Sequence, residues 1–226
     1  MRIMLTGMFK KAKTNKNKFV FQIISGKSTI EKDILTQMLT SLPCNIYSHS
    51  VRVSVVSGIL AKKINNIPKD AKTDNFSFSV SLGGLYHHIG EIAIHSKEKK
   101  HLPCVSELII DENLQIETLI SNADKEVIMD TVRHYHERMD GSGYPDGLSG
   151  NEISITARIV GFADILDKLL TGKNKTTKKH LEKALKFTKK QGIVLFGMDV
   201  IECFDETQDE IFNLYLNHQK RIQASA

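Results

Sequence analysis

The segment that most restricts the fold lies at residues 154–171, SITARIVGFADILDKLLT, and is apolar on nearly every side of the helix that it predicts. Its large apolar side chains recur at the helical period and form one stripe, which consists of Ile155, Ile159, Phe162, Leu166 and Leu169. The opposite side carries Ala157, Val160 and Gly161 together with two aspartates, so it is not an ordinary polar face. A helix that is apolar nearly all round is buried nearly all round, and we therefore expect it at the centre of a helical core.

Asp164 lies on the small-residue side of this helix and needs a partner inside the protein. A bare carboxylate there would cost several kcal/mol, so it must be paired with an arginine or backbone amides, protonated, or bound to a cation. His49 and His87 lie on apolar stripes of other predicted helices, and a third candidate, His136, follows Val132 by four residues. A single core histidine is usually satisfied by its neighbours. Three imidazoles with an inward carboxylate, however, form a ligand set that Fe, Mn, Zn or Ni accept.

The remaining periodicity predicts an all-α protein. Apolar residues recur at helical spacing over seven further stretches, which are 29–43, 45–66, 76–89, 105–121, 123–138, 177–191 and 197–222. A glycine-rich loop is expected at 140–152. We expect about seven to nine helices in one domain over residues 29–226. Residues 1–28 are expected to form either an N-terminal arm or a small β-hairpin made of RIML and KFVFQIIS.

The composition predicts a globular protein of the cytoplasm. The three cysteines are scattered without metal-type spacing, as expected of free and mostly buried thiols. The N-terminus has too short an apolar run for a signal peptide, and no run of about 18 apolar residues predicts a membrane span. The net charge of +5 favours an anionic partner. We interpret the lysine runs at 10–18, 97–100 and 173–190 as solvated faces rather than a nucleic-acid interface, because they contain few aromatics.

Residues 136–167, HERMDGSGYPDGLSGNEISITARIVGFADILD, closely resemble the signature of the HD-GYP family of metal-dependent phosphodiesterases, which hydrolyse the bacterial messenger cyclic di-GMP. HSVRVS at 49–54 and LYHHIGE at 85–91 resemble two further segments of that family. The resemblance covers about residues 40–205. It implies an HD-type helical bundle and leaves the N-terminal residues unexplained.

Carried over position by position, the resemblance implies metal-ligating roles for His49, His87, His136 and Asp164. It also implies that a loop beside the catalytic groove binds substrate, and this loop contains Asp140, Gly141, Gly143, Tyr144 and Pro145. The glycines suit such a loop because they give the backbone a freedom that other residues lack. Arg158, one turn into the next helix, is expected either to brace the loop through a salt bridge or to contact phosphate.

Three departures from the family pattern fall at the implied reaction centre. His88 replaces an aspartate that bridges two metals, and a neutral imidazole cannot bridge because it offers one lone pair. Tyr135 replaces the first histidine of a pair, and a phenol with a pKa near 10 is a poor ligand for divalent ions. Glu91 stands where the family has a lysine near the substrate phosphate, which reverses a charge.

Three further positions bear on the ligand count. Asn45 occupies the place of a glutamate ligand found in three-metal members of the family. His101 is the best candidate for the ligand of the family's middle helix, although it could equally lie in a surface loop. His134 is one residue from Tyr135, but that step turns a helix by about 100°, so it is a doubtful replacement.

The kept and lost positions together predict a site for one divalent ion, such as Fe or Mn, rather than two, or for none. We therefore expect an HD-GYP protein of cyclic di-GMP signalling that is degenerate at its metal centre. It would bind a cyclic dinucleotide or a signalling protein such as a diguanylate cyclase. The alternative is an active phosphodiesterase, in which a metal-bound hydroxide opens the cyclic dinucleotide and Asp164 orients the ion. There His88, Glu91 or His134 would act as an unconventional ligand or a general base.

Overall fold

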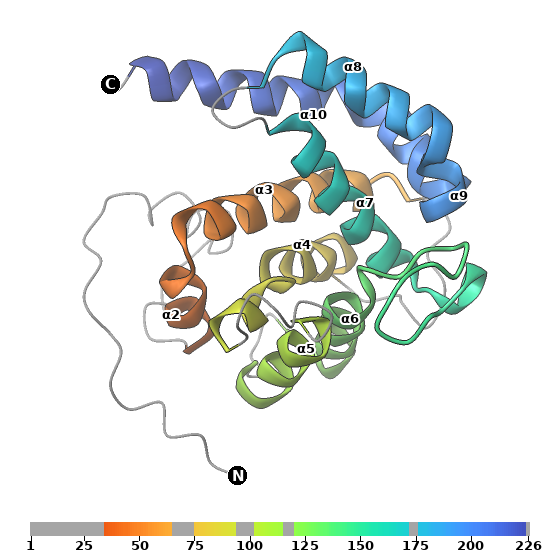
Figure 1. Cartoon of the computed structure of the whole chain (residues 1–226). Coiled ribbons are helices and arrows are strands. Elements are labelled where there is room, and N and C mark those ends of the chain that lie inside the picture. Colours follow the sequence, from red (N-terminus) through yellow and green to blue (C-terminus); the bar gives the residue numbers. More distant parts are fainter. Residues whose placement is uncertain (1–33, 65–74, 94–101, 115–119, 172–175, 225–226) are drawn as a thin grey trace.

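The computed structural model of the chain describes residues 34–64, 75–93, 102–114, 120–171 and 176–224, and within these ranges it contains helices and no strand. The all-α prediction is confirmed (Figure 1). The α-helices are α2 Ile34–Ser41, α3 Cys44–Ala61, α4 Phe76–Tyr86, α5 Leu102–Asn113, α6 Asn122–His134, α7 Ile155–Leu170, α8 Lys178–Phe187, α9 Ile193–Phe196 and α10 Met198–Ala224. The predicted arm or hairpin at 1–28 lies outside the described residues.

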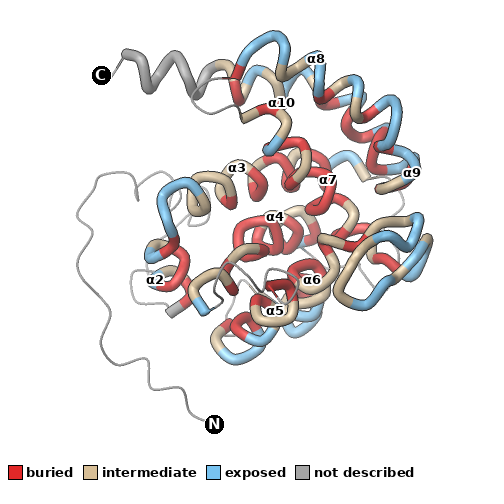
Figure 2. Tube along the Cα trace, in the orientation of Figure 1, coloured by how far each residue is buried: buried red, intermediate tan, exposed pale blue. Residues whose placement is uncertain are grey.

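Helix α7 occupies the centre of the bundle, as its apolar sequence predicts (Figure 2). It begins where the hydroxyl of Ser154 accepts a hydrogen bond from the backbone N–H of Ala157. It packs against α3, α4 and α6 on one side and against α8, α9 and α10 on the other. Both Asp164 and Asp167 are buried with it, whereas Leu169 at the end of the predicted stripe is only half-buried.

Two apolar clusters surround this helix. The first joins α7 to α3, α8, α9 and α10 through side chains that include Phe162, Phe196 and Phe204. The second joins α2, α4, α5 and α6 through side chains such as Leu85, Ile110 and Val132. Helix α4 contributes side chains to both clusters and so connects them.

Several helices end earlier than the sequence predicts, including α3 at Ala61 and α5 at Asn113, and two of these early ends bear on the site. Helix α4 ends at Tyr86 rather than at residue 89, and a 3-10 turn over Ile89–Ile92 follows it. Ser106 of α5 fixes that turn, because its hydroxyl accepts a hydrogen bond from the N–H of Gly90 and donates one to the carbonyl of His87. Helix α6 ends at His134 rather than at residue 138. Both early ends lie next to candidate ligands, and they change where those side chains point.

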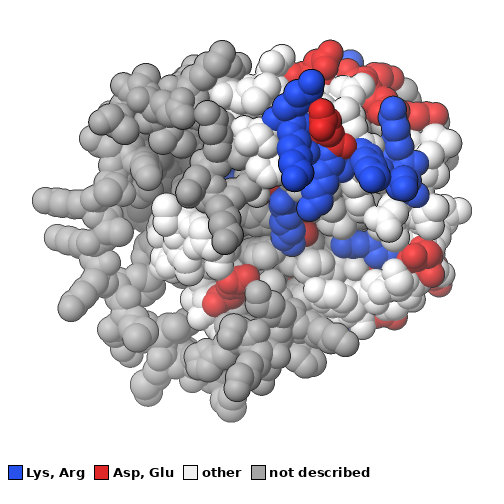
Figure 3. Space-filling view, turned by 45° about the horizontal axis from the view of Figure 1, so that its top comes forward, with Lys and Arg blue, Asp and Glu red and all other residues white. Residues whose placement is uncertain are grey.

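Lysine and arginine side chains gather on the face shown in Figure 3, with aspartate and glutamate side chains near them. Lys178, Lys179, Lys183, Lys186, Lys189 and Lys190 are all exposed. The described part of the predicted run at 173–190 is therefore solvated, while the runs at 10–18 and 97–100 lie outside the described residues. No helix in the described part of the chain is long and apolar enough to cross a membrane. The cysteines are free, but Cys44 is exposed, contrary to the expectation of mostly buried thiols.

Candidate metal centre

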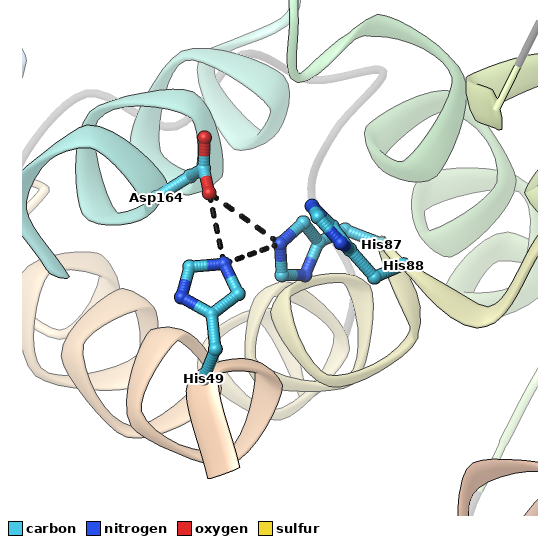
Figure 4. Close-up of side chains that lie close together, drawn as sticks. All are labelled: His49, His87, His88 and Asp164. Atoms are coloured by element: carbon cyan, nitrogen blue, oxygen red, sulfur yellow. Dashed lines mark hydrogen bonds and ion pairs between the residues drawn. The ribbon is translucent and has the colours of Figure 1, made fainter. Parts of the chain in front are cut away.

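Four side chains from three segments lie close together in the interior (Figure 4). His49 comes from α3, Asp164 from α7, and His87 and His88 from the C-terminal end of α4. Each offers one ligand atom, and these atoms all lie within 4.8 Å of one another. Asp164 and His87 are almost fully buried, at 1% and 0% exposure, so their polar atoms cannot be satisfied by bulk water. One oxygen of Asp164, Oδ1, therefore faces a group of imidazoles.

His49 is oriented by a second buried carboxylate. Its Nδ1 lies 2.6 Å from Oδ2 of Asp167, and its Nε2 lies 2.9 Å from Oδ1 of Asp164. Asp167 is itself held by Arg52, with Nε at 2.6 Å, and by the hydroxyl of Tyr215 at 2.7 Å. A carboxylate that holds the outer nitrogen of a histidine fixes the ring and aims the other nitrogen at a metal. Asp167 and Tyr215 belong to the site, although sequence reasoning did not assign them to it.

The other two histidines are fixed in a similar way. His87 places Nδ1 2.7 Å from the carbonyl oxygen of Gly84, so that nitrogen must carry the proton and Nε2 keeps its lone pair. His88 places Nδ1 3.1 Å from Oε1 of Glu91. Its Nε2 is buried and has no hydrogen-bond partner in the described structure. Each ring thus has one nitrogen bound to an outer partner and one nitrogen available to the interior.

The charges in the cluster are strongly coupled. Burial alone would raise the pKa of Asp164, but the hydrogen bond from His49 and the charge of Lys168 outweigh it and hold the pKa well below the usual value. Burial would lower the pKa of His49, but hydrogen bonds to Asp164 and Asp167 outweigh it and raise that pKa. Burial lowers the pKa of His87, with the neighbouring histidines adding to it, and keeps that ring neutral. A proton on Nε2 of His49 therefore lies between a carboxylate and a neutral imidazole.

The arrangement fits a metal ion. Nε2 of His49 and Nε2 of His87 are 3.3 Å apart, and Nε2 of His87 is 3.7 Å from Oδ1 of Asp164. Such separations suit ligand atoms that share one ion at about 2.0–2.2 Å. Two buried polar atoms without partners, Nε2 of His88 and the hydroxyl of Tyr135, lie in this region, and an ion would account for the first of them. The nitrogen and oxygen donors suit a borderline divalent metal.

The second oxygen of Asp164 has a different partner. Nζ of Lys168 lies 2.6 Å from Oδ2 of Asp164, one helical turn further along α7. The carboxylate therefore presents only Oδ1 to the histidines. Lys168 was not singled out by sequence reasoning, because a lysine four residues after an aspartate is typical of any surface helix.

His136, which the sequence predicts as a ligand, is not among the four residues of this cluster. It lies beyond the end of α6, where a spacing of four from Val132 no longer puts two residues on one face. Its ring centroid is 4.1 Å from that of Tyr135 and 4.5 Å from that of Tyr144. Tyr135 in turn lies 4.9 Å from His87, so a row of rings connects the glycine-rich loop to the cluster. Burial lowers the pKa of His136 to about 3, which leaves its ring neutral.

The phenol of Tyr135 stays protonated beside the cluster. Burial, followed by the charge of Asp164, raises the pKa of Tyr135 well above its usual value. Its ring is fully buried, and its centroid lies 6.0 Å from that of His88. The residue that replaces a family histidine is thus a neutral hydroxyl donor next to the site.

The glycine-rich loop is anchored by a buried glutamate. Oε1 of Glu137 accepts hydrogen bonds from the N–H groups of Asp146 and Gly147, at 2.7 and 3.0 Å. A Cβ on Gly143 would collide with the backbone of Glu137, so only glycine permits this close approach. Gly141 has φ of 76°, and the Tyr144–Pro145 peptide bond is cis.

The substrate-binding residues predicted in this loop differ in exposure. Asp140 is exposed and accepts hydrogen bonds from the hydroxyl and the N–H of Ser142, which lower the pKa of Asp140. Tyr144 is half-buried against His136. Arg158 forms a salt bridge to Asp199 of α10 at 2.6 Å, so its ion pair is with that helix and not with the loop.

Other predicted residues lie apart from the cluster. His134 is held between Oδ1 of Asp130 at 2.7 Å and Oδ2 of Asp146 at 2.9 Å, so it connects α6 to the loop instead of replacing a ligand. Asn45 is exposed on the first turn of α3. His101 lies outside the described residues.

Comparison with known proteins places these residues in a wider context. A protein-family model described as HD domain matches residues 33–200. The chain is 24% identical over 204 residues to a cyclic di-GMP phosphodiesterase of Thermotoga maritima, a match that covers 87% of this chain and 52% of that protein. It is 29% identical over 133 residues to the 3'3'-cGAMP-specific phosphodiesterase 1 of Vibrio cholerae, which covers 54% of this chain and 28% of that protein.

Two more similarities agree with these. The chain is 60% identical over 42 residues to the cyclic di-GMP phosphodiesterase response regulator RpfG of Xanthomonas campestris, covering 19% of this chain and 11% of that protein. Among solved structures, Bd1817, a HDG"Y"P protein from Bdellovibrio bacteriovorus, shares the fold with a TM-score of 0.52 at 18% identity, over 71% of this chain and 51% of that chain. The chain spans about half the length of the Thermotoga relative.

Proposed function

The chain belongs to the HD domain family, in agreement with the HD-GYP resemblance of its sequence, and on that premise we propose that it binds a cyclic dinucleotide at a centre for one divalent ion. The relatives are named for acting on cyclic di-GMP or 3'3'-cGAMP, which supports a cyclic dinucleotide as the ligand class. In this proposal the chain lacks two-ion chemistry and works as a binding module in cyclic di-GMP signalling. A fold does not guarantee the usual reaction of its family, so the site must carry the argument.

The observation that carries the proposal is the donor set of three imidazoles and one carboxylate. His88 stands at the position where the family resemblance implies a bridging aspartate, and an imidazole nitrogen has one lone pair to offer. Asp164 presents one oxygen to the cluster, because Lys168 holds the other. Two ions held about 3.5–4 Å apart would therefore have no shared carboxylate among these four residues.

In this function His49, His87, His88 and Asp164 would hold the ion, and Fe or Mn suits the mixed nitrogen and oxygen donors. When bound, the ion would attract a phosphate oxygen as a Lewis acid. Asp167 keeps the outer nitrogen of His49 protonated and the ring aimed at the site. The half-buried ring of Tyr144 offers an aromatic surface on which a nucleobase can stack.

The test is to load the purified chain with Mn²⁺, titrate it with cyclic di-GMP by calorimetry, and analyse the mixture for hydrolysis products by chromatography. The proposal predicts binding without product. As a matched gain-of-function control, His88→Asp combined with Tyr135→His should restore turnover, because it returns a bridging carboxylate and a ligand nitrogen. Failure of the parent chain to bind either cyclic di-GMP or 3'3'-cGAMP would contradict the proposal.

The second candidate function is an active phosphodiesterase, and the pair formed by His88 and Glu91 favours it. Nδ1 of His88 and Oε1 of Glu91 are 3.1 Å apart, and both side chains are partly buried, at 12% and 24% exposure. Such a pair can move a proton, since the carboxylate stabilises the charged ring. Product formed by the parent chain, and lost in Glu91→Gln, would establish this candidate in place of the binding module.

A further inference from the structure

A positive charge supplied by the chain itself lies beside the proposed metal centre. Nζ of Lys168 is 2.6 Å from Oδ2 of Asp164, the oxygen that does not face the histidines. The Lys168 side chain is 51% exposed, whereas the Asp164 side chain is 1% exposed. The ammonium group therefore extends from solvent into the edge of a buried site.

The ammonium group keeps donors for another ligand. A lysine has three N–H donors and no acceptor. Among the described residues Lys168 makes its one hydrogen bond to Asp164, so two donors remain for a molecule at the edge of the site. Burial lowers the pKa of both His88 and His136, and the charge of Lys168 adds to that lowering in each ring. The positive charge of Lys168 therefore acts both on the cluster and on the row of rings that leads to the loop.

The neighbouring cations of the described structure are already engaged. Both Nε and Nη2 of Arg52 bind Asp167. Arg138 donates to the carbonyl oxygens of Tyr135 and Glu137 and lies over the ring of Phe196. Glu91 has an anionic side chain, and its contact is with His88. Lys168, by contrast, binds a ligand carboxylate of the cluster directly, and its side chain is 51% exposed.

We propose that Lys168 is the phosphate-binding cation of this site and takes, beside Asp164, the place of a second metal ion. The proposal rests on the proposed function and adds to it how a phosphodiester is held. In a two-ion site the second cation balances carboxylate charge and contacts the phosphate. A compact ammonium group can do both, because one N–H binds Oδ2 of Asp164 while the others reach a phosphate oxygen. The same charge repels a second divalent ion and limits the site to one.

The experiment compares the parent chain, residues 1–226, with Lys168→Met, Lys168→Arg and the matched control Lys183→Met. Lys183 is an exposed lysine of α8 without an ion pair in the described structure. Calorimetry measures the affinity for Mn²⁺ alone and the affinity for cyclic di-GMP at saturating Mn²⁺. Thermal unfolding of each variant shows that it is folded, and Lys168→Arg keeps the charge if the methionine variant unfolds.

We expect Lys168→Met to bind cyclic di-GMP about tenfold more weakly, which is the loss of one charged hydrogen bond to phosphate. The same variant should bind Mn²⁺ several-fold more tightly, because Asp164 loses a competing cation. Lys168→Arg should stay within about threefold of the parent for cyclic di-GMP, since it keeps a donor and a charge. Lys183→Met should match the parent in both titrations.

Equal cyclic di-GMP affinity in the parent and Lys168→Met would overturn the inference and leave the proposed function standing. If the parent binds no cyclic dinucleotide, the proposed function fails and the phosphate role fails with it. The Mn²⁺ titration still tests the second-cation role in that case. Tighter Mn²⁺ binding by Lys168→Met would support that role, and equal or weaker binding would overturn it.

Discussion

Replacement of Asp167 by asparagine tests whether the buried carboxylate behind His49 prepares the metal site. Asp167 is 0% exposed and binds three groups: Nδ1 of His49 at 2.6 Å, Nε and Nη2 of Arg52 at 2.6 and 3.0 Å, and the hydroxyl of Tyr215 at 2.7 Å. Asparagine has one acceptor oxygen and an NH₂ group. It cannot accept from all three partners, and it leaves the guanidinium of Arg52 without a counter-charge.

Two effects follow, and they have different sizes. Removal of one partner from a buried ion pair costs about 3–5 kcal/mol, so Asp167→Asn should lower the free energy of unfolding by about that amount. Loss of the group that orients a ligating histidine typically costs about 10–100-fold in metal affinity. Folded Asp167→Asn protein should therefore bind Mn²⁺ more weakly than the folded parent. This loss comes from a changed tautomer and orientation of the His49 ring and not from unfolding.

The assay is Mn²⁺ calorimetry at a temperature where each variant is folded, combined with urea unfolding. Tyr215→Phe is the matched control, since it removes one hydroxyl bond to Asp167 and leaves the carboxylate in place. It should cost about 1 kcal/mol of stability and change Mn²⁺ affinity little. If Asp167→Asn is destabilised but binds Mn²⁺ as tightly as the parent, Asp167 does not prepare His49 and our reasoning about the support of the site is wrong.

Three further predictions concern packing, the loop and the ion. Gly161→Ala should lower the free energy of unfolding in urea by about 1–3 kcal/mol, because the added Cβ would lie under 3.0 Å from the carbonyl oxygen of Tyr135. Unchanged stability would mean that α7 can move away from that carbonyl. Burial alone would lower the pKa of His134, but its hydrogen bonds to Asp130 and Asp146 outweigh burial and raise that pKa. The contribution of His134 to the free energy of unfolding is therefore complete below about pH 6.5 and is lost as the pH rises through the raised pKa. His134→Gln should therefore be less stable than the parent at pH 6, with the gap closing toward pH 9, and a gap that is constant with pH would contradict this. Addition of Mn²⁺ at about 100 times its dissociation constant should stabilise the parent by about 2.7 kcal/mol, and His49→Ala should lose most of that gain in a thermal-shift measurement.

The central helix and the need of its aspartate for a partner were predictable from the sequence. Periodicity alone places Asp164 on a helix that is buried on all sides, and α7 begins and ends within one residue of the predicted range 154–171. His49 and His87 were predictable as its partners because each lies on an apolar stripe of another helix. These predictions depend only on the spacing of apolar residues within one helix, and that spacing determines which residues share a face.

The identity of the remaining donors was not predictable in this way. A helix continued to residue 89 would turn His88 about 100° away from His87. The chain leaves the helix after Tyr86, and the backbone of His88 takes φ of −105° and ψ of 10°, which lets both rings face the cluster. His136 shows the reverse, because the early end of α6 removes it from the predicted face. Helix ends are set by tertiary contacts such as those of Ser106, which a periodic pattern does not contain.

The residues that bind the buried aspartates of the site, Tyr215 and Lys168, could not be predicted for another reason. Tyr215 reaches Asp167 from α10, 48 residues along the chain, and nothing in its local sequence marks that contact. Lys168 has the spacing of an ordinary surface ion pair, and its partner is unusual only because Asp164 is buried. Three-dimensional position gives these residues their roles.

The measurement that most directly tests the central claim is anomalous diffraction from crystals of the chain soaked in Mn²⁺. A one-ion centre predicts a single peak within bonding distance of Nε2 of His49, His87 and His88 and of Oδ1 of Asp164. Two peaks about 3.5–4 Å apart would contradict it, as would a peak bound to His136 in place of His88.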